Sequence, residues 1–181
     1  MMEEQNNNSQ SPQTTAAKII RQNAISLSAI FIIVLVVTYL FREQTKGIES
    51  YFWIAYAVMM LFGILYTQMQ VRERINGGLI TFGEAFGAGF KMSLWVALIF
   101  AVFNFIFYQF IFPEAQDEML QLTEQSMREE GMSEDEIEMG MKMTGFFVSP
   151  LGILISTMVI YPILGAIGSL IAAAFTQRSK R

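Results

Sequence analysis

The sequence predicts an all-α integral membrane protein, a four-helix bundle with a short helical acidic insert between its third and fourth helices. The chain of 181 residues is 53% hydrophobic, above the roughly 45–50% that is usual for soluble domains. Its apolar residues form four uncharged segments, 24–41, 51–70, 92–112 and 146–176. Each is close to or longer than the roughly 20 residues that cross a bilayer as a helix. None alternates as a membrane β-strand does, so helices are expected.

These segments define the expected organisation of the chain. We predict a disordered polar tail over residues 1–17 and a membrane domain over residues 18–181. The spans are expected at about 22–41, 51–70, 91–112 and 147–175, with the acidic insert at 113–145. Polar residues precede the first apolar segment, which has full span length, so we interpret it as a signal anchor that is retained.

Charge predicts the orientation in the membrane. The insert contains ten acidic residues against Arg128 and Lys142, a net charge of −8, whereas the whole chain carries −4. Under the positive-inside rule the side richer in Lys and Arg is cytoplasmic. We therefore predict a multi-pass membrane protein with both termini in the cytoplasm and the insert outside. The cytoplasmic side would hold Lys18, Arg21, Arg72, Arg74, Lys91, Arg178, Lys180 and Arg181, and the other side Arg42, Lys46, Arg128 and Lys142.

Capping signals predict where the central helices begin and end. Ser50 suits the start of the second helix, which should stop at Asn76-Gly77-Gly78 because glycine accepts the left-handed backbone of a helix end. Thr81 and Glu84 fit a capping box. The third helix is therefore expected to begin at about residue 82, well before its uncharged segment, with an amphipathic first part over residues 81–91.

Similar signals predict two short helices in the insert. Pro113 suits a first helical turn, and the stretch after it favours a helix until Gly131. A second capping box, Ser133 to Glu136, should start the other helix. In the last span Pro162 is expected to kink the helix.

Several segments resemble a known family. They are Ile80-Thr81-Phe82-Gly83-Glu84-Ala85-Phe86, the aromatic span ending Phe110-Ile111-Phe112-Pro113, Gly131-Met132-Ser133-Glu134-Asp135-Glu136-Ile137-Glu138, and the last helix bounded by Pro150. Together they resemble a membrane-protein family found mainly in Bacteroidota, the domain of unknown function 4199, over residue 18 to the end. The resemblance implies a four-helix bundle in the bacterial inner membrane and implies no activity.

Polar residues within the predicted spans are candidates for function. Thr67, Gln68, Asn104 and Gln109 are expected to form hydrogen bonds between helices, and the alternative is a substrate path. Glu84 and Lys91 share a helix face and are interpreted as a pair near the headgroups, with a gating role as the alternative.

Small residues at four-residue spacing allow close helix packing. Packing within the monomer is the simpler interpretation, and a homodimer face is the alternative. The steps concerned are Gly83 and Gly87, Gly152 and Ser156, and Gly165, Ser169 and Ala173.

The acidic insert is the most promising place to look for function. Its carboxylates could bind Ca²⁺ or Mg²⁺, but they are spread along helical stretches rather than in a ligand loop, which favours a solvated surface. Six methionines of the insert could hold Cu(I), although packing or partner contact is the more usual role. They are Met119, Met127, Met132, Met139, Met141 and Met143.

No residue pattern in the sequence indicates a catalysed reaction. Without histidine or cysteine the commonest general base and the thiol nucleophile are missing, and no phosphate-binding loop or metal-ligand cluster is present. We expect no catalytic residue, cofactor or metal, and no nucleic-acid partner. The expected role is that of a non-enzymatic accessory or interaction protein that works through its acidic insert. The alternative is a small oligomeric transporter or channel-like protein.

Overall fold

A computed structural model of the chain describes residues 12–45 and 49–178 and confirms the all-α class. Four helices are long and apolar enough to cross a membrane, over Thr15–Leu40, Tyr51–Arg74, Phe82–Ile111 and Pro150–Thr176. The elements are α1 (Pro12–Leu40), α2 (Glu49–Arg74), α3 (Phe82–Ile106), the π-helical turn η1 (Phe107–Ile111), α4 (Glu114–Glu129), α5 (Glu134–Val148) and α6 (Pro150–Thr176).

Two helices begin earlier in the structure than expected from the sequence. The helix α1 already begins at Pro12, so residues 12–17 are helical rather than part of a disordered tail. Proline is well suited to the first turn because the missing N–H has no partner there in any helix. Residues 1–11, the rest of the predicted tail, lie outside the described residues. The helix α2 begins at Glu49, so Ser50 lies inside its first turn and is not its N-cap.

The turn from α2 to α3 follows the predicted signals. Gly77 and Gly78 have positive φ angles of 60° and 89°, and the Gly78 amide donates to the Arg72 carbonyl at 2.9 Å. Glu84 accepts from the amide and hydroxyl of Thr81 at 2.9 and 2.8 Å and donates its own amide to that hydroxyl. From this capping box α3 runs without a break to Ile106.

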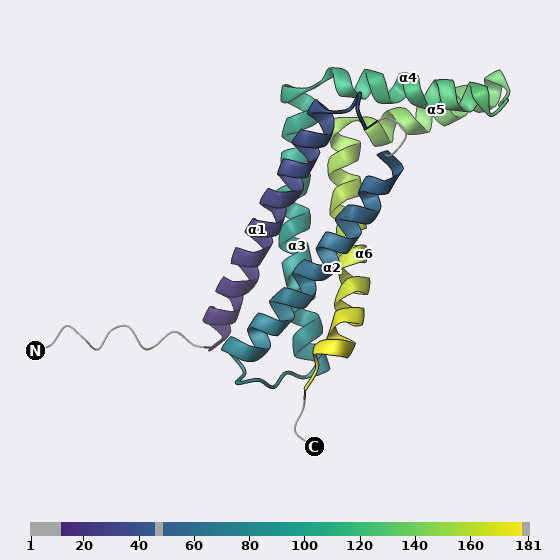
Figure 1. Cartoon of the computed structure of the whole chain (residues 1–181). Helices are drawn as coiled ribbons and strands as arrows, with labels where there is room; N and C mark the ends of the chain where they lie inside the picture. Colours follow the sequence, from purple (N-terminus) through teal and green to yellow (C-terminus); the bar gives the residue numbers. More distant parts are fainter. Residues whose placement is uncertain (1–11, 46–48, 179–181) are drawn as a thin grey trace, which may run out of the picture. The chain divides into compact units, whose positions relative to one another are not determined.

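The chain forms two compact units. The first contains α1, α2, α3 up to Val96 and α6 from Tyr161. In this unit α1 and α2 lie side by side (Figure 1). The fully buried ring of Phe31 on α1 makes edge contacts with Tyr56 on α2 and Tyr161 on α6, at centroid distances of 4.9 and 5.9 Å.

Small residues let α6 approach α3 closely inside the first unit. A Cβ atom on Gly165 would lie 2.0 Å from the Ser93 hydroxyl, and one on Gly89 would lie 2.7 Å from that of Ser169. Large apolar side chains point outward instead, among them Phe62 and Phe175. Extensive apolar exposure is typical of a surface that faces lipid.

The second unit, Ala97–Ile160, contains the end of α3, η1, the helices α4 and α5 and the start of α6. Here α4 and α5 lie side by side as an antiparallel hairpin (Figure 1). The hairpin runs across the direction of the α3 and α6 segments to which it is joined. The prediction of two short helices in the insert is thereby confirmed.

Candidate functional site

The α4–α5 hairpin is joined closely to a membrane-spanning segment at each end. Only Phe112 and Pro113 separate η1 from α4, and only Ser149 separates α5 from α6. Next to the first junction, the Gln116 side chain donates a 2.8 Å hydrogen bond to the Tyr108 carbonyl. The base of the hairpin is therefore held against the end of the preceding apolar segment.

The core between α4 and α5 is thin. Among the large apolar side chains of the two helices only Ile137 is buried, at 4% exposure. Closer to the base, Gly140 provides space for Met127, whose terminal methyl carbon would lie 2.8 Å from a Cβ at that glycine. Met141 is half-buried. Because the core is small, polar contacts contribute to the geometry of the hairpin.

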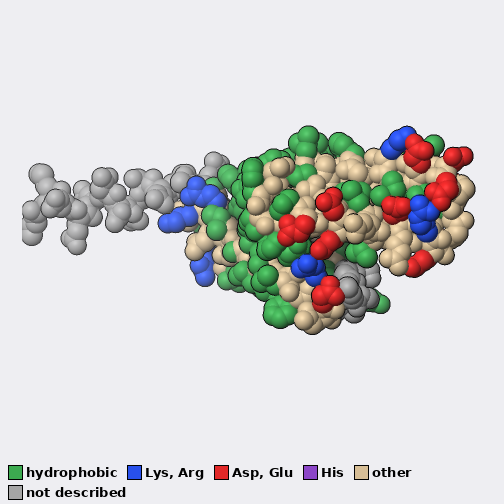
Figure 2. All heavy atoms as spheres, turned by 90° about the horizontal axis from the view of Figure 1, so that it is seen from above, with side chains coloured by type: hydrophobic (Ala, Val, Ile, Leu, Met, Phe, Trp, Pro, Cys, Tyr) green, Lys and Arg blue, Asp and Glu red, His purple; other side chains and the backbone are tan. Residues whose placement is uncertain are grey.

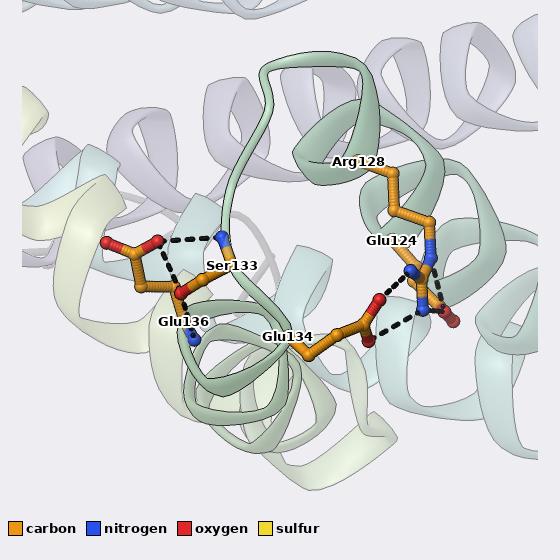
Figure 3. A network of polar contacts seen from close by, with 5 residues as sticks. All are labelled: Glu124, Arg128, Ser133, Glu134 and Glu136. Carbon is orange, nitrogen blue, oxygen red and sulfur yellow. Dashed lines mark hydrogen bonds and ion pairs between the residues drawn. The ribbon is translucent and has the colours of Figure 1, made fainter.

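The tip of the hairpin carries such contacts (Figure 3). Gly131 ends α4 with a positive φ of 77°. The Ser133 hydroxyl caps α5 by accepting from the Glu136 amide, and the Glu136 carboxylate accepts from the Ser133 amide at 2.8 Å. These contacts hold the pKa of the Glu136 carboxyl below its ordinary value, since the Ser133 amide and hydroxyl both bind the charged form.

Arg128 connects the two helices electrostatically. Its guanidinium donates to Glu124 on α4 at 2.9 Å and to Glu134 on α5 (Figure 3). Hydrogen bonding and charge attraction from Arg128 lower the pKa of the Glu134 carboxyl, and the same contacts raise the pKa of the guanidinium. All three side chains are substantially exposed, so their main effect is on geometry.

Acidic side chains cover much of the hairpin. Figure 2 shows them gathered over this part of the molecule, with a few basic side chains among them. Three of these acids form ion pairs. Glu124 and Glu134 pair with Arg128, and Glu138 pairs with Lys142 at 2.7 Å. The remaining acids of the hairpin are exposed, except for Glu118, which is half-buried; they are Glu114, Asp117, Glu118, Glu129, Glu130, Asp135 and Glu136.

The described residues contain no group of three His, Cys, Asp or Glu side chains placed to hold a metal ion. The methionines do not converge either: Met139 and Met143 are exposed, whereas Met127 packs against Gly140.

A second group of polar residues is buried at one end of the first unit. Gln68 on α2 donates to the Ser169 carbonyl of α6 at 3.2 Å and accepts from the Thr176 hydroxyl at 2.7 Å. Arg72, only 7% exposed, donates to the Thr176 carbonyl at 3.0 Å. Asn23 on α1 donates to Thr67 at 3.1 Å.

This polar cluster, Asn23, Thr67, Gln68, Arg72 and Thr176, joins three helices. Hydrogen bonds between helices were expected for Thr67 and Gln68, and the structure has them. The sequence interpretation missed Arg72, which was considered only as a cytoplasmic charge. Its position four residues after Gln68 on the same helix face was a usable signal.

A family model described as "Protein of unknown function (DUF4199)" matches residues 22–178. The chain belongs to this family. The match includes the complete hairpin and confirms the resemblance noted in the sequence. No curated protein and no solved structure matched the chain.

The other candidate residues predicted for this DUF4199 protein belong to neither the hairpin nor the polar cluster. Asn104 is buried but donates to the Phe100 carbonyl of its own helix at 2.7 Å, so it differs from the expected bond between helices. Gln109 is exposed in η1. The Glu84 carboxylate serves the capping box with Thr81, and Lys91 is exposed.

The small residues at four-residue spacing differ in whether they lie against another helix. Gly165 and Ser169 face α3, as packing within the monomer requires. A Cβ on Gly152 would instead meet the backbone of Phe146, in the adjoining corner rather than in another span. At Gly83 and Gly87 a Cβ would meet no heavy atom within 4 Å. Those two glycines therefore make no close helix contact among the described residues.

Proposed function

We propose that this DUF4199 protein is a non-enzymatic accessory protein of the bacterial inner membrane that binds a protein partner through its α4–α5 hairpin. The observation that carries the proposal is the concentration of ten acidic residues against two bases in residues 113–145, on a hairpin held by a capping box and a bridging arginine. Complementary charge accelerates and orients the encounter with a basic partner.

The hairpin is proposed to lie on the extracytoplasmic side of the inner membrane. Bonds from Asn23 to Thr67, from Arg72 to the Thr176 carbonyl and between Ile80 and Arg178 bring four helix ends together in the first unit. This end also carries most bases of the described residues. The positive-inside rule supports a cytoplasmic position for it, and this favours the opposite side of the membrane for residues 113–145, after one more crossing. The bases are Lys18, Arg21, Arg72, Arg74, Lys91 and Arg178.

The alternative, a small oligomeric transporter, has less support. It requires polar side chains that are free to line a path. Gln68 and Asn104 are instead bonded to neighbouring groups of the protein.

Charge-neutral hairpin variants test the proposal. The combined variant Asp117→Asn, Glu129→Gln and Glu130→Gln removes three exposed charges outside the arginine bridge. The matched control Asp117→Glu, Glu129→Asp and Glu130→Asp keeps them. Each protein would be isolated from its native membrane in lipid-preserving particles, and the co-purified proteins measured by mass and stoichiometry.

We expect a stoichiometric partner with the wild-type and control proteins, lost or strongly reduced with the neutral variant and at high salt, where exposed charge interactions are screened. The same partner at unchanged stoichiometry with the neutral variant would reject the hairpin as the binding surface. A pure homo-oligomer with no attached protein would contradict the accessory role.

A further inference from the structure

The outer side of α5 carries an apolar stripe that the acidic surface does not explain. Met139, Met143 and Phe146 are 70%, 62% and 51% exposed. They follow the i, i+4, i+7 spacing of one helix face. At about 100° per residue they lie roughly 180–240° around the axis from Ile137, which is buried. We call these three residues the outer stripe.

The outer stripe faces away from α4. Ile137 is the buried residue of α5, and Gly140 contacts Met127 of α4, so that side of α5 forms the core of the hairpin. In the second unit, α5 lies on the side of α4 nearer to the span α6, and both helices run across the direction of that span (Figure 1). The side of α5 opposite α4 is therefore turned toward the plane at which α6 enters the membrane.

The corner between α5 and α6 fixes this direction. Ser149 is the single residue between the helices; its hydroxyl donates to the Phe146 carbonyl at 2.6 Å and accepts from the Gly152 amide at 3.0 Å. Gly152 has no side chain where the Phe146 backbone approaches. With so close a contact, α5 cannot swing freely about the end of α6.

The stripe is also continuous with a surface that faces lipid. Phe147, beside it, is 53% exposed, and Leu151 and Ile155 continue the exposed apolar surface on the first turns of α6. The same medium that covers the apolar surface of a span is expected to cover the residues directly beside it. Phenylalanine and other apolar side chains of surface helices are typically buried in the boundary between headgroups and acyl chains.

We propose that α5 lies on the membrane surface with the outer stripe inserted into the boundary between headgroups and acyl chains. Free surface helices use basic residues to reach anionic lipid, whereas α5 is mainly acidic. It needs no such attraction because α6 already holds it at the bilayer. Lipid under α5 leaves α4, with its acidic side chains, turned to water.

Single-cysteine probes test this placement, because the chain contains no cysteine of its own. Met139→Cys and Met143→Cys would report the stripe. Gln125→Cys on the exposed side of α4 is the control for water, and Val159→Cys in α6 is the control for lipid. Each full-length protein would carry an environment-sensitive fluorophore in phosphatidylcholine nanodiscs with one copy per disc. Quenching would be measured with iodide in water and with doxyl-labelled phosphatidylcholine.

We expect labels at residues 139 and 143 to lose fluorescence with the doxyl lipid, as the label at 159 does, and to respond weakly to iodide. The label at 125 should behave in the opposite way. Iodide quenching at 139 and 143 equal to that at 125 would overturn the proposal, since the stripe would then face water. Protection from both quenchers would also overturn it, because protein rather than lipid would cover the stripe. Unchanged helicity and elution volume would show that each labelled variant is folded. No partner is present in the discs, so the outcome is independent of the proposed accessory role.

Discussion

The hydroxyl of Thr176, in the last turn of α6, donates a 2.7 Å hydrogen bond to the side-chain oxygen of Gln68 in α2. Both side chains are almost fully buried. The amide of Gln68 in turn donates to the Ser169 carbonyl. One glutamine therefore fixes two positions of α6, two turns apart, against α2.

The Gln68–Thr176 bond should contribute measurably to stability. In a double-mutant cycle of Gln68→Leu and Thr176→Val, we expect a coupling of about 0.6 kcal/mol, the mean for hydrogen bonds between membrane helices, and no more than about 1.7 kcal/mol. Reversible unfolding in mixed micelles measures it. The conservative variant Met69→Leu, at an exposed position of α2, should have little effect. A coupling near zero would mean that the two side chains do not stabilise each other.

Close packing at Gly165 should tolerate no added methyl group. We expect Gly165→Ala to lower the free energy of unfolding by about 1–3 kcal/mol, the usual cost of overpacking, because its Cβ would lie 2.0 Å from the Ser93 hydroxyl. The matched variant Gly83→Ala meets no neighbouring atom and should be neutral or slightly stabilising. Ser93→Gly should partly rescue Gly165→Ala. Equal losses at both glycines would contradict the close crossing.

The carboxyl of Glu134 should titrate below its ordinary pKa because Arg128 binds the charged form. A lowered folded-state pKa makes a stabilising contribution above the unfolded value of about 4.3, and this contribution is lost as the pH falls through the folded value. NMR titration of the carboxyl in nanodiscs measures the shift. We expect Arg128→Gln to raise the pKa of Glu134 and to leave that of Glu136, which depends on Ser133, unchanged. Equal movement of both carboxyls would indicate general loss of the hairpin.

The proposed orientation predicts opposite labelling at two exposed positions. An impermeant thiol reagent added to cells with a permeable outer membrane should modify Ser126→Cys in α4. It should modify Gln177→Cys, just after α6, only once the inner membrane is opened. The reverse pattern would invert the topology and place the hairpin in the cytoplasm. Both positions are exposed, so burial cannot produce the difference.

Local signals in the sequence predicted the local features well. The capping boxes at Thr81 and Ser133 and the positive φ angles at Gly77 and Gly131 depend on residues within a few positions, and they are present. The contact of Gly165 with Ser93 depends instead on how two distant helices are rotated, which a span that is apolar all round does not reveal. Arg72 was missed for a related reason, since its charge predicted a side of the membrane and not a partner.

The Arg72 contact has a consequence for how the protein can move. The guanidinium satisfies the Thr176 carbonyl at the end of α6, where a helix lacks partners of its own. Sliding α6 past α2 by one helical turn, about 5.4 Å, would break this bond and both bonds of Gln68 together. A ratchet of one helix along the other is therefore opposed at this end of the protein, and a rocking motion would have to carry α2 and the last turns of α6 as one rigid body.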